Sequence, residues 1–227
     1  MLSPYQIVFN QLLAIDNVVF GYQEGELKLL LFERNLEPEL GRWSLIGGWV
    51  KADESVENAA IRVLKSITGL QNIFMEQVQV FSKPDRDPGG RVISVVFYAL
   101  INIQEHNHQL VNQYNAQWWP VNKLPELIFD HGQMVNMALE KLRFKASFDL
   151  VGRDLLPAEF TLTDLRNLYN AIFLKSLDPG NFRKKILSLN ALDKLNKKDA
   201  SGSKKGAYLY TFKKNSTIDI KDRIIKW

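Results

Sequence analysis

The segment from Gly48 to Leu70 constrains the fold more than any other part of this 227-residue chain. A short polar loop follows Gly47 and Gly48 and leads into a helical pattern over residues 55–68. In that stretch, counted from Val56, apolar residues recur at 3, 4, 7, 8 and 11 positions along the chain. This spacing places them on one face of a helix. The segment therefore predicts an amphipathic helix that covers an apolar surface.

Short apolar segments bounded by turn residues precede and follow this helix in the sequence, and they predict a β-sheet. The predicted strands cover residues 17–22, 27–32, 78–81, 91–101 and 118–121. The first two are separated by a turn at 23–26 and are expected to pair as a hairpin, and a turn-rich segment, 83–90, precedes the strand at 91. Asp130 is then the expected N-cap of a helix near 131–145. Mixed strands and helices of this kind predict an α/β domain.

The composition excludes some classes of site and location. The chain contains no cysteine, which excludes disulfides and thiolate metal sites and agrees with a reducing compartment. No apolar run approaches the roughly 18 residues that a membrane helix needs. The first residues lack the basic stretch of a signal peptide, so a cytoplasmic location is expected.

Charge is distributed unevenly along the chain. Residues 1–150 carry 13 Lys and Arg against 17 Asp and Glu, a net charge of −4, whereas residues 151–227 carry 16 against 8, a net charge of +8. A basic C-terminal third after an acidic body indicates a polyanionic partner, most often nucleic acid. A solvated basic surface without a partner is the alternative.

Two short helices are predicted in the basic third. Thr161 and Asp164 form a capping signature for the first helix, and Asp178 followed by Pro179 starts the second. The second helix buries Phe182, Ile186 and Leu189. Its outward positions are Asn181, Lys184, Lys185 and Ser188, with Arg183 at the edge. This arrangement is typical of a helix-turn-helix whose second helix meets the bases of DNA.

A β-hairpin is predicted after the two helices. Its strands are residues 191–195 and 207–212, and its loop contains Lys204 and Lys205. Such a wing would place cations against phosphate, while the recognition helix meets base edges. A helical subdomain with a solvated lysine surface remains the alternative interpretation.

The opening segment resembles the Nudix box. That box is a glycine, five residues, a glutamate, seven residues, Arg-Glu, an aliphatic, any residue, Glu-Glu, any residue, a glycine and an aliphatic. The matching positions in this chain are Gly48, Glu54, Arg62, Leu64, Gly69 and Leu70, and residues 43–48 are similar to the lead-in of the box. The resemblance implies the Nudix α/β/α sandwich around a mixed sheet.

The same resemblance argues against catalysis. Nudix hydrolases hold Mg²⁺ with three glutamates at positions i, i+3 and i+4, on one face of the helix. Those positions are Val63, Ser66 and Ile67 in this chain, so we expect no catalytic residue, no metal and no other cofactor. Glu54 and Arg62 are expected to pair across the loop and the helix in a structural role.

A degenerate Nudix domain followed by a winged helix-turn-helix resembles the Nudix-related transcriptional regulators of the NrtR and AraR group. The resemblance covers nearly the whole chain and includes the box frame and residues 85–88, 91–95, 129–131, 160–163, 181–185 and 206–210. It implies a ligand-binding domain at 1–145, a DNA-binding domain at 146–227 and no membrane partner. It also implies a bacterial homodimer on a palindromic operator, controlled by an ADP-ribose-type molecule or a sugar such as L-arabinose. Lys204-Lys205-Gly206 departs from the NAD-linked branch and favours the pentose.

The predicted effector pocket lies around the former active site. Trp43 would stack on a sugar, Tyr98 would stack or hydrogen-bond, and Asp85, Arg86 and Asp87 would bind hydroxyls. The full predicted set is Trp43, Gly47, Gly48, Asp85, Arg86, Asp87 and Tyr98. The structural alternatives are Trp43 in the core, a self-paired Asp-Arg-Asp turn and Tyr98 as a sheet residue.

Two further readings remain open at this level. A Nudix hydrolase could use other carboxylates, namely Glu54, Glu57 or Glu76, and the chain could be an interaction module without a small ligand. His106, His108 and His131 are too scattered to indicate a metal site, and His131 is expected to orient the start of a helix.

Overall fold

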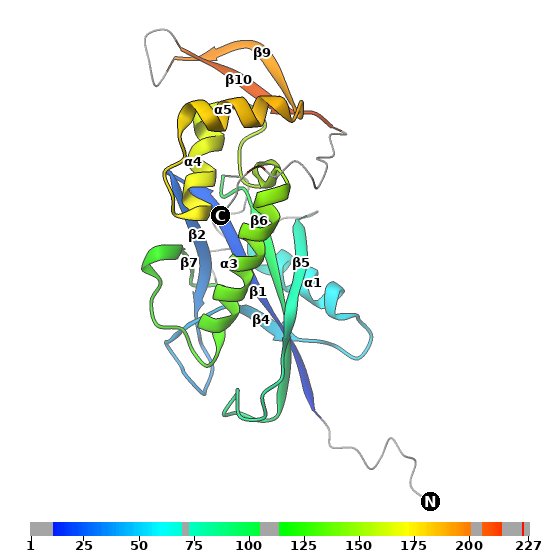
Figure 1. The fold of residues 1–227 in the computed structure, drawn as a ribbon. Coiled ribbons are helices and arrows are strands. Elements are labelled where there is room, and N and C mark those ends of the chain that lie inside the picture. Colours follow the sequence, from blue (N-terminus) through cyan, green and yellow to red (C-terminus); the bar gives the residue numbers. More distant parts are fainter. Residues whose placement is uncertain (1–10, 70–72, 105–113, 201–205, 215–223, 225–227) are drawn as a thin grey trace, which may run out of the picture.

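The computed structural model describes residues 11–69, 73–104, 114–200, 206–214 and 224 (Figure 1). The predicted DNA-binding residues Lys204 and Lys205, together with His106 and His108, lie outside the described residues. The first residues, from which the cytoplasmic location was expected, also lie outside the described residues.

A mixed sheet forms the centre of the N-terminal domain (Figure 1). Its strands are β1 (Leu12–Gln23), β2 (Glu26–Glu33), β3 (Trp43–Ser44), β4 (Ile46–Trp49), β5 (Phe74–Phe81), β6 (Val92–Ile101) and β7 (Ala116–Pro120). The main order is β3-β2-β1-β6-β5, with β4 paired to β1 and β7 paired to β2. Strands β1 and β6 run parallel, whereas the other pairs are antiparallel. The predicted hairpin at 23–26 is present, and each predicted strand overlaps an observed one.

Helix α1 (Val56–Thr68) covers one face of this sheet. Ser55 caps its start, because its side chain accepts a hydrogen bond from the Asn58 amide at 3.2 Å. Its buried residues, including Ala59, Ala60 and Leu64, join the sheet in one apolar cluster. The helix that the periodicity predicted over 55–68 is confirmed.

Helix α3 (His131–Phe148) lies on the opposite face, as Figure 1 shows. Its buried residues pack on β1, β5 and β6, which completes the α/β/α sandwich. The same helix also contacts α4 (Leu162–Phe173) of the C-terminal part, and Arg143 Nε donates to the Ile172 carbonyl at 2.9 Å. The apolar cluster under α3 continues without a break into α4. The predicted boundary after residue 145 therefore falls inside the last turn of one continuous helix.

The C-terminal part is a winged helix. It contains the single-turn helix η3 (Val151–Arg153), then β8 (Phe160–Thr161), α4, α5 (Pro179–Ser188), β9 (Leu192–Asp199) and β10 (Ala207–Phe212). The other single-turn helix, η2 (Val121–Lys123), follows β7 in the N-terminal domain. The capping box predicted at Thr161 and Asp164 is present, with the Asp164 amide 3.1 Å from Thr161 Oγ1 and the Thr161 amide 2.8 Å from Asp164 Oδ2. Asp178 caps α5 as expected.

The wing differs from its prediction in the length of its first strand. Lys197 and Lys198 were expected in the loop, but both belong to β9, which pairs with β10 as far as Asp199. The ladder continues because β10 supplies tyrosines opposite the lysines, and Tyr208 pairs with Lys198. The predicted strand at 118–121 is also shifted, since β7 ends at Pro120 and Val121 begins a helical turn. No helix in the described part of the chain is long and apolar enough to cross a membrane.

Replacing the capping threonine tests the origin of α4. We expect Thr161→Ala to lower the free energy of unfolding by about 1 kcal/mol, because the Asp164 amide loses its acceptor. Denaturant unfolding measured by circular dichroism gives the difference. Thr163→Ala is the matched control, since Thr163 is exposed in the same turn and should change stability by less than about 0.5 kcal/mol. Equal effects of the two substitutions would contradict the capping role.

Candidate functional site

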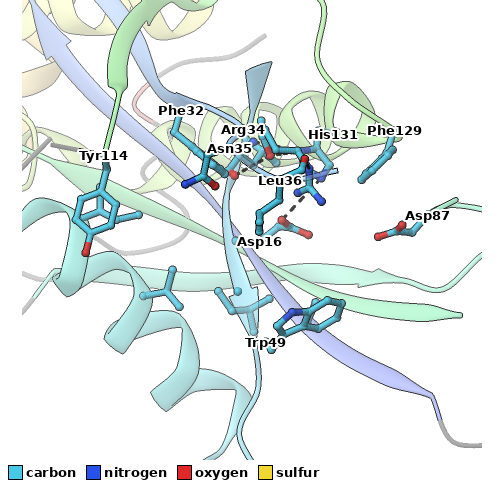
Figure 2. Close-up of a pocket in the computed structure, with 18 of the residues that line it drawn as sticks. Asp16, Phe32, Arg34, Asn35, Leu36, Trp49, Asp87, Tyr114, Phe129 and His131 are labelled. Atoms are coloured by element: carbon cyan, nitrogen blue, oxygen red, sulfur yellow. Dashed lines mark hydrogen bonds and ion pairs between the residues drawn. The ribbon is translucent and has the colours of Figure 1, made fainter. Parts of the chain in front are cut away.

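A cavity of about 830 Å³ opens between the sheet, α1 and the start of α3 (Figure 2). Its walls come from β1, from the loop after β2, from β4, from α1 and from the loop before β6. Both apolar and polar side chains line it, which is typical of small-molecule sites.

Gly47 and Gly48 allow β4 to approach its neighbours closely. A Cβ at Gly48 would lie 2.9 Å from Cγ2 of Val63, and a Cβ at Gly47 would lie 2.5 Å from Oδ1 of Asp16. Real side chains essentially never make contacts this short, so any side chain would push β4 away from α1 or from β1. Both glycines line the cavity that this approach creates.

The loop between β4 and α1 is fixed by the pair that the spacing predicted. Arg62 donates from Nε and Nη2 to the Glu54 carboxylate at 2.9 and 2.6 Å, and from Nη2 to the Trp49 carbonyl at 3.0 Å. The Lys51 amide also donates to Glu54, at 2.9 Å. The hydrogen bonds from Arg62 hold the pKa of Glu54 at about 2, well below its ordinary value. The structural role expected for this pair is confirmed.

The helix face that holds metal in Nudix hydrolases is apolar in this chain. Val63 and Ile67 are buried in the cluster under α1, and the Ser66 hydroxyl donates to the Val63 carbonyl at 2.7 Å. Among the described residues, no group of three or more His, Asp or Glu side chains could hold a metal ion. Hard divalent cations require several oxygen ligands. The residues at this position therefore do not fit the divalent cation that the Nudix fold implies.

Arg86 and Asp130 form a buried ion pair beside the cavity. Arg86 donates from Nε and Nη2 to the two oxygens of Asp130 at 2.9 and 2.7 Å. Asp130 stands at the N-cap position of α3, but its side chain makes no capping hydrogen bond because Arg86 occupies it. This corrects the predicted capping role. The pair joins the loop before β6 to the beginning of α3.

His131 is buried in the cavity wall as a neutral ring. The Leu45 amide donates to Nδ1 at 3.1 Å, so the ring proton belongs on Nε2, which lies 3.8 Å from Oδ1 of Asp16. The other Asp16 oxygen accepts from the Ser94 hydroxyl at 2.5 Å. Burial lowers the pKa of His131, and the positive charges of Arg86 and Arg34 lower it further against the opposing effect of Asp16 and Asp130.

The predicted effector residues divide into two groups. Gly47, Gly48, Arg86 and Asp87 line the cavity, whereas Trp43, Asp85 and Tyr98 do not.

Tyr98 and Trp43 occupy their structural alternatives. Tyr98 is fully buried in the cluster on the α3 side and donates to Glu76 at 3.0 Å, and burial raises its pKa. Trp43 packs edge-on against Trp119, with ring centroids 5.2 Å apart. Asp85 is exposed in its turn. These three side chains do not line the cavity.

Several residues that line the cavity were not predicted from the sequence. The Trp49 indole is 56% exposed at the cavity, although Trp49 directly follows the two glycines and its position could have indicated this role. Arg34, Phe129 and Tyr114 come from three separate loops and also face the cavity, as Figure 2 shows. No local pattern marks them, since only the fold brings these loops together.

The second helix of the winged domain presents the predicted basic face. Asn181, Arg183, Lys184 and Ser188 are exposed on α5, while Lys185 is half-buried. Phe182 and Ile186 are buried on the opposite side. Figure 1 shows α5 beside the hairpin of β9 and β10. Four of the five outward residues expected on this helix are thus exposed, and the helix lies beside the wing.

Two lysines of β9 lie against a tyrosine of β10, namely Lys194, which was not predicted as a cation of the wing, and Lys198, which was predicted in its loop. Lys194 Nζ lies 3.5 Å and Lys198 Nζ 4.8 Å from the centre of the Tyr208 ring. Lys197 points elsewhere and pairs with Glu159 at 2.8 Å. Lys194 and Lys198 are four residues apart, so they lie on the same side of a strand, because side chains alternate between its two faces. A prediction of β9 at its full length would have indicated this.

Two family models match the chain. The NUDIX domain matches residues 12–137, and the NrtR DNA-binding winged helix domain matches residues 152–212. The first covers more than half of the chain, and together they leave the second half of α3 as the joint between the matched regions.

Relatives of the whole chain and of its first domain are known. It is 29% identical to the ADPR responsive transcriptional repressor NtrR of Acinetobacter baylyi, over 88% of this chain and 82% of that protein. It is 34% identical to an ADP-ribose pyrophosphatase of Methanocaldococcus jannaschii, over 59% of this chain and 76% of that protein.

Solved structures of Shewanella oneidensis NrtR are also similar. The complex with a 27mer DNA gives a TM-score of 0.80 at 31% identity, covering 88% of this chain and 93% of that one. Its NUDIX domain with ADP ribose gives a TM-score of 0.53 at 34% identity, covering 62% of this chain and 94% of that one.

The neutral state of His131 predicts a pH dependence of stability. Below its ordinary pKa of about 6.5, the unfolded histidine binds a proton that the buried ring does not. The free energy of unfolding should therefore fall as pH drops from about 7.5 to 5.5, by at most about 1.4 kcal/mol per pH unit. In His131→Asn, whose amide can still accept from Leu45 but does not titrate, that part of the slope should vanish. Chemical denaturation at several pH values measures both, and identical slopes would refute the assignment.

Proposed function

We propose a function from the premise that this chain belongs to the NUDIX domain family and, through its winged helix, to the NrtR regulators. It is a transcriptional repressor whose Nudix domain binds an ADP-ribose-type effector without hydrolysing it. The observation that carries this proposal is the combination, in one chain, of a basic recognition helix and a Nudix cavity that lacks metal-binding carboxylates.

The DNA-binding part of the proposal is supported by charge and shape. The outward residues of α5 would enter the major groove, and Lys194, Lys198 and the predicted Lys204 and Lys205 would contact phosphate from the wing. Shewanella oneidensis NrtR, which shares this architecture, has been solved with DNA. We infer a homodimer on a palindromic operator, because winged helices of this type read two half-sites related by two-fold symmetry. Such a regulator acts in the cytoplasm, where bacterial DNA lies.

The choice of effector is supported by the size of the cavity and by the relatives. A cavity of about 830 Å³ can hold a nucleotide sugar, whereas a free pentose would occupy a fraction of it. The exposed Trp49 indole offers a flat surface for a base. The relatives from Acinetobacter baylyi and Shewanella oneidensis are associated with ADP-ribose. We therefore propose ADP-ribose in place of the L-arabinose that Lys204-Lys205-Gly206 favoured.

Hydrolysis of ADP-ribose is the second candidate, because the relative from Methanocaldococcus jannaschii is an ADP-ribose pyrophosphatase. The carboxylates considered as substitutes do not gather in one place. Glu54 is held by Arg62, and Glu76 pairs with Tyr98 and Lys141 on the α3 side of the sheet. Glu57 lies exposed in the first turn of α1. We propose that the domain has lost its hydrolase activity.

The proposal predicts that ADP-ribose releases the protein from its own upstream DNA. A mobility-shift titration with ADP-ribose, L-arabinose and no ligand tests this, because effector and DNA must change each other's affinity by the same factor. Chromatography of ADP-ribose incubated with protein and Mg²⁺ should show no AMP and no ribose 5-phosphate. Release by arabinose alone would make the effector a sugar, and hydrolysis that disappears in Glu54→Gln would make the chain an enzyme.

The recognition helix can be tested through salt dependence. We expect Lys184→Ala to weaken operator binding and to reduce the slope of log K against log salt by about 1, the change for one lost phosphate contact. Lys83→Ala is the matched control, since Lys83 is an exposed lysine of the ligand-binding domain and its loss changes net charge equally. Fluorescence anisotropy at several salt concentrations measures both slopes. Equal slopes in the two variants would place the DNA surface elsewhere.

A further inference from the structure

We propose that Arg34 binds the diphosphate of the effector directly, so that the cavity takes its ligand without a divalent cation. This inference rests on the proposed function, and it assigns to one side chain the charge that Mg²⁺ supplies in Nudix hydrolases.

Three guanidinium groups line the cavity, and two of them are already neutralised. Arg62 is paired with Glu54 at 2.6 Å, and Arg86 is paired with Asp130 at 2.7 Å. Arg34 donates from Nε to the carbonyl oxygens of Leu36 and Pro38, at 3.0 and 2.7 Å. Within the described part of the chain, no carboxylate lies at ion-pair distance from Arg34. Its full positive charge is therefore available to a ligand.

The Arg34 side chain is held in place before any ligand arrives. The two carbonyl oxygens bind one edge of the guanidinium, and the Phe129 ring centre lies 5.7 Å from Cζ. These contacts use Nε and leave the two terminal nitrogens for an anion. A guanidinium fixed in this way loses little side-chain freedom on binding and can donate two parallel hydrogen bonds to phosphate oxygens.

Arg34 also lies at the polar floor of the cavity. Its charge is one of the causes that lower the pKa of His131, which places it within electrostatic range of that ring. Figure 2 shows Arg34 beside His131, with Asp16 below them. The Asp16 carboxylate accepts a hydrogen bond from the Ser94 hydroxyl and faces His131. The side chains of Glu33 and Glu37 are exposed to solvent. Arg34 is therefore the one arginine of the cavity that has no carboxylate at ion-pair distance in the described structure.

The chemistry of the ligand makes this cation necessary. A diphosphate carries two negative charges, and an anion removed from water needs a counter-charge. Hydrolases meet this need with Mg²⁺ on helix carboxylates, but Val63, Ser66 and Ile67 offer no such site. Arg34 supplies charge without holding or activating a water molecule. Recognition without turnover follows, which is what a sensor requires.

Calorimetric titration of the full chain with ADP-ribose tests the inference. Wild-type affinity in EDTA should equal that in Mg²⁺ within about twofold. Arg34→Gln should weaken ADP-ribose binding about 10- to 100-fold, the range for loss of a charged hydrogen bond, and Arg34→Lys should give an intermediate value. Adenosine, which lacks the diphosphate, should bind wild type and Arg34→Gln equally.

Arg42→Gln is the matched control. Arg42 belongs to the same loop but does not line the cavity, and it pairs with Glu39 and Glu126, so its loss should change affinity by less than about twofold. Unchanged melting temperatures without ligand establish that the Arg34 variants are folded.

Three results would overturn the inference in distinguishable ways. A requirement for Mg²⁺, or wild-type affinity in Arg34→Gln, would remove the role of Arg34 while leaving ADP-ribose as the effector. Failure of the wild type to bind ADP-ribose in either buffer would remove the proposed effector itself, and the role of Arg34 with it.

Discussion

The burial of α3 on two sides is the constraint on which the rest of the structure depends. Met134, Ala138 and Leu142 pack under the sheet of the N-terminal domain, and the same apolar cluster runs on into α4. Tyr169 on α4 donates to the Asp149 carbonyl at the end of α3, at 2.9 Å. Separating the two parts would expose this cluster to water. The free-energy cost would be about 25 cal/mol for each Å² of apolar surface exposed. A displacement of α3 therefore changes the wall of the cavity and the support of the DNA-binding helices together.

The survival of the Nudix frame without its carboxylates has a physical explanation. The glycine pair, Glu54 and Arg62 shape the loop and the approach of β4 to α1, and none of these contacts involves a metal. Val63 and Ile67, in contrast, are buried among apolar neighbours. A carboxylate there would need compensation for its buried charge. The frame residues build the cavity through contacts that do not depend on the missing glutamates.

Local interactions were predictable from the sequence, and contacts between distant segments were not. The capping box of Thr161, the turn at 23–26 and the Glu54–Arg62 pair depend on residues close in the chain. Arg86 was predicted to bind effector hydroxyls, with a self-paired turn as the alternative, but the fold brings Asp130 to it from 44 residues away. Trp43 and Trp49 carry the same side chain, but Trp43 packs against Trp119 of the distant strand β7, whereas Trp49 stays exposed.

An effector can control DNA binding only if it contacts something that differs between the two states of the protein. In the described structure, Phe129 connects the cavity to the start of α3. Its ring lies 5.7 Å from the Arg34 guanidinium and 5.8 Å from the His131 ring. Its φ of 50° is uncommon for a side chain of this size. A phosphate bound to Arg34 would lie close to Phe129, the residue next to Asp130, where Arg86 holds the start of α3. It would therefore act on the helix that both domains share.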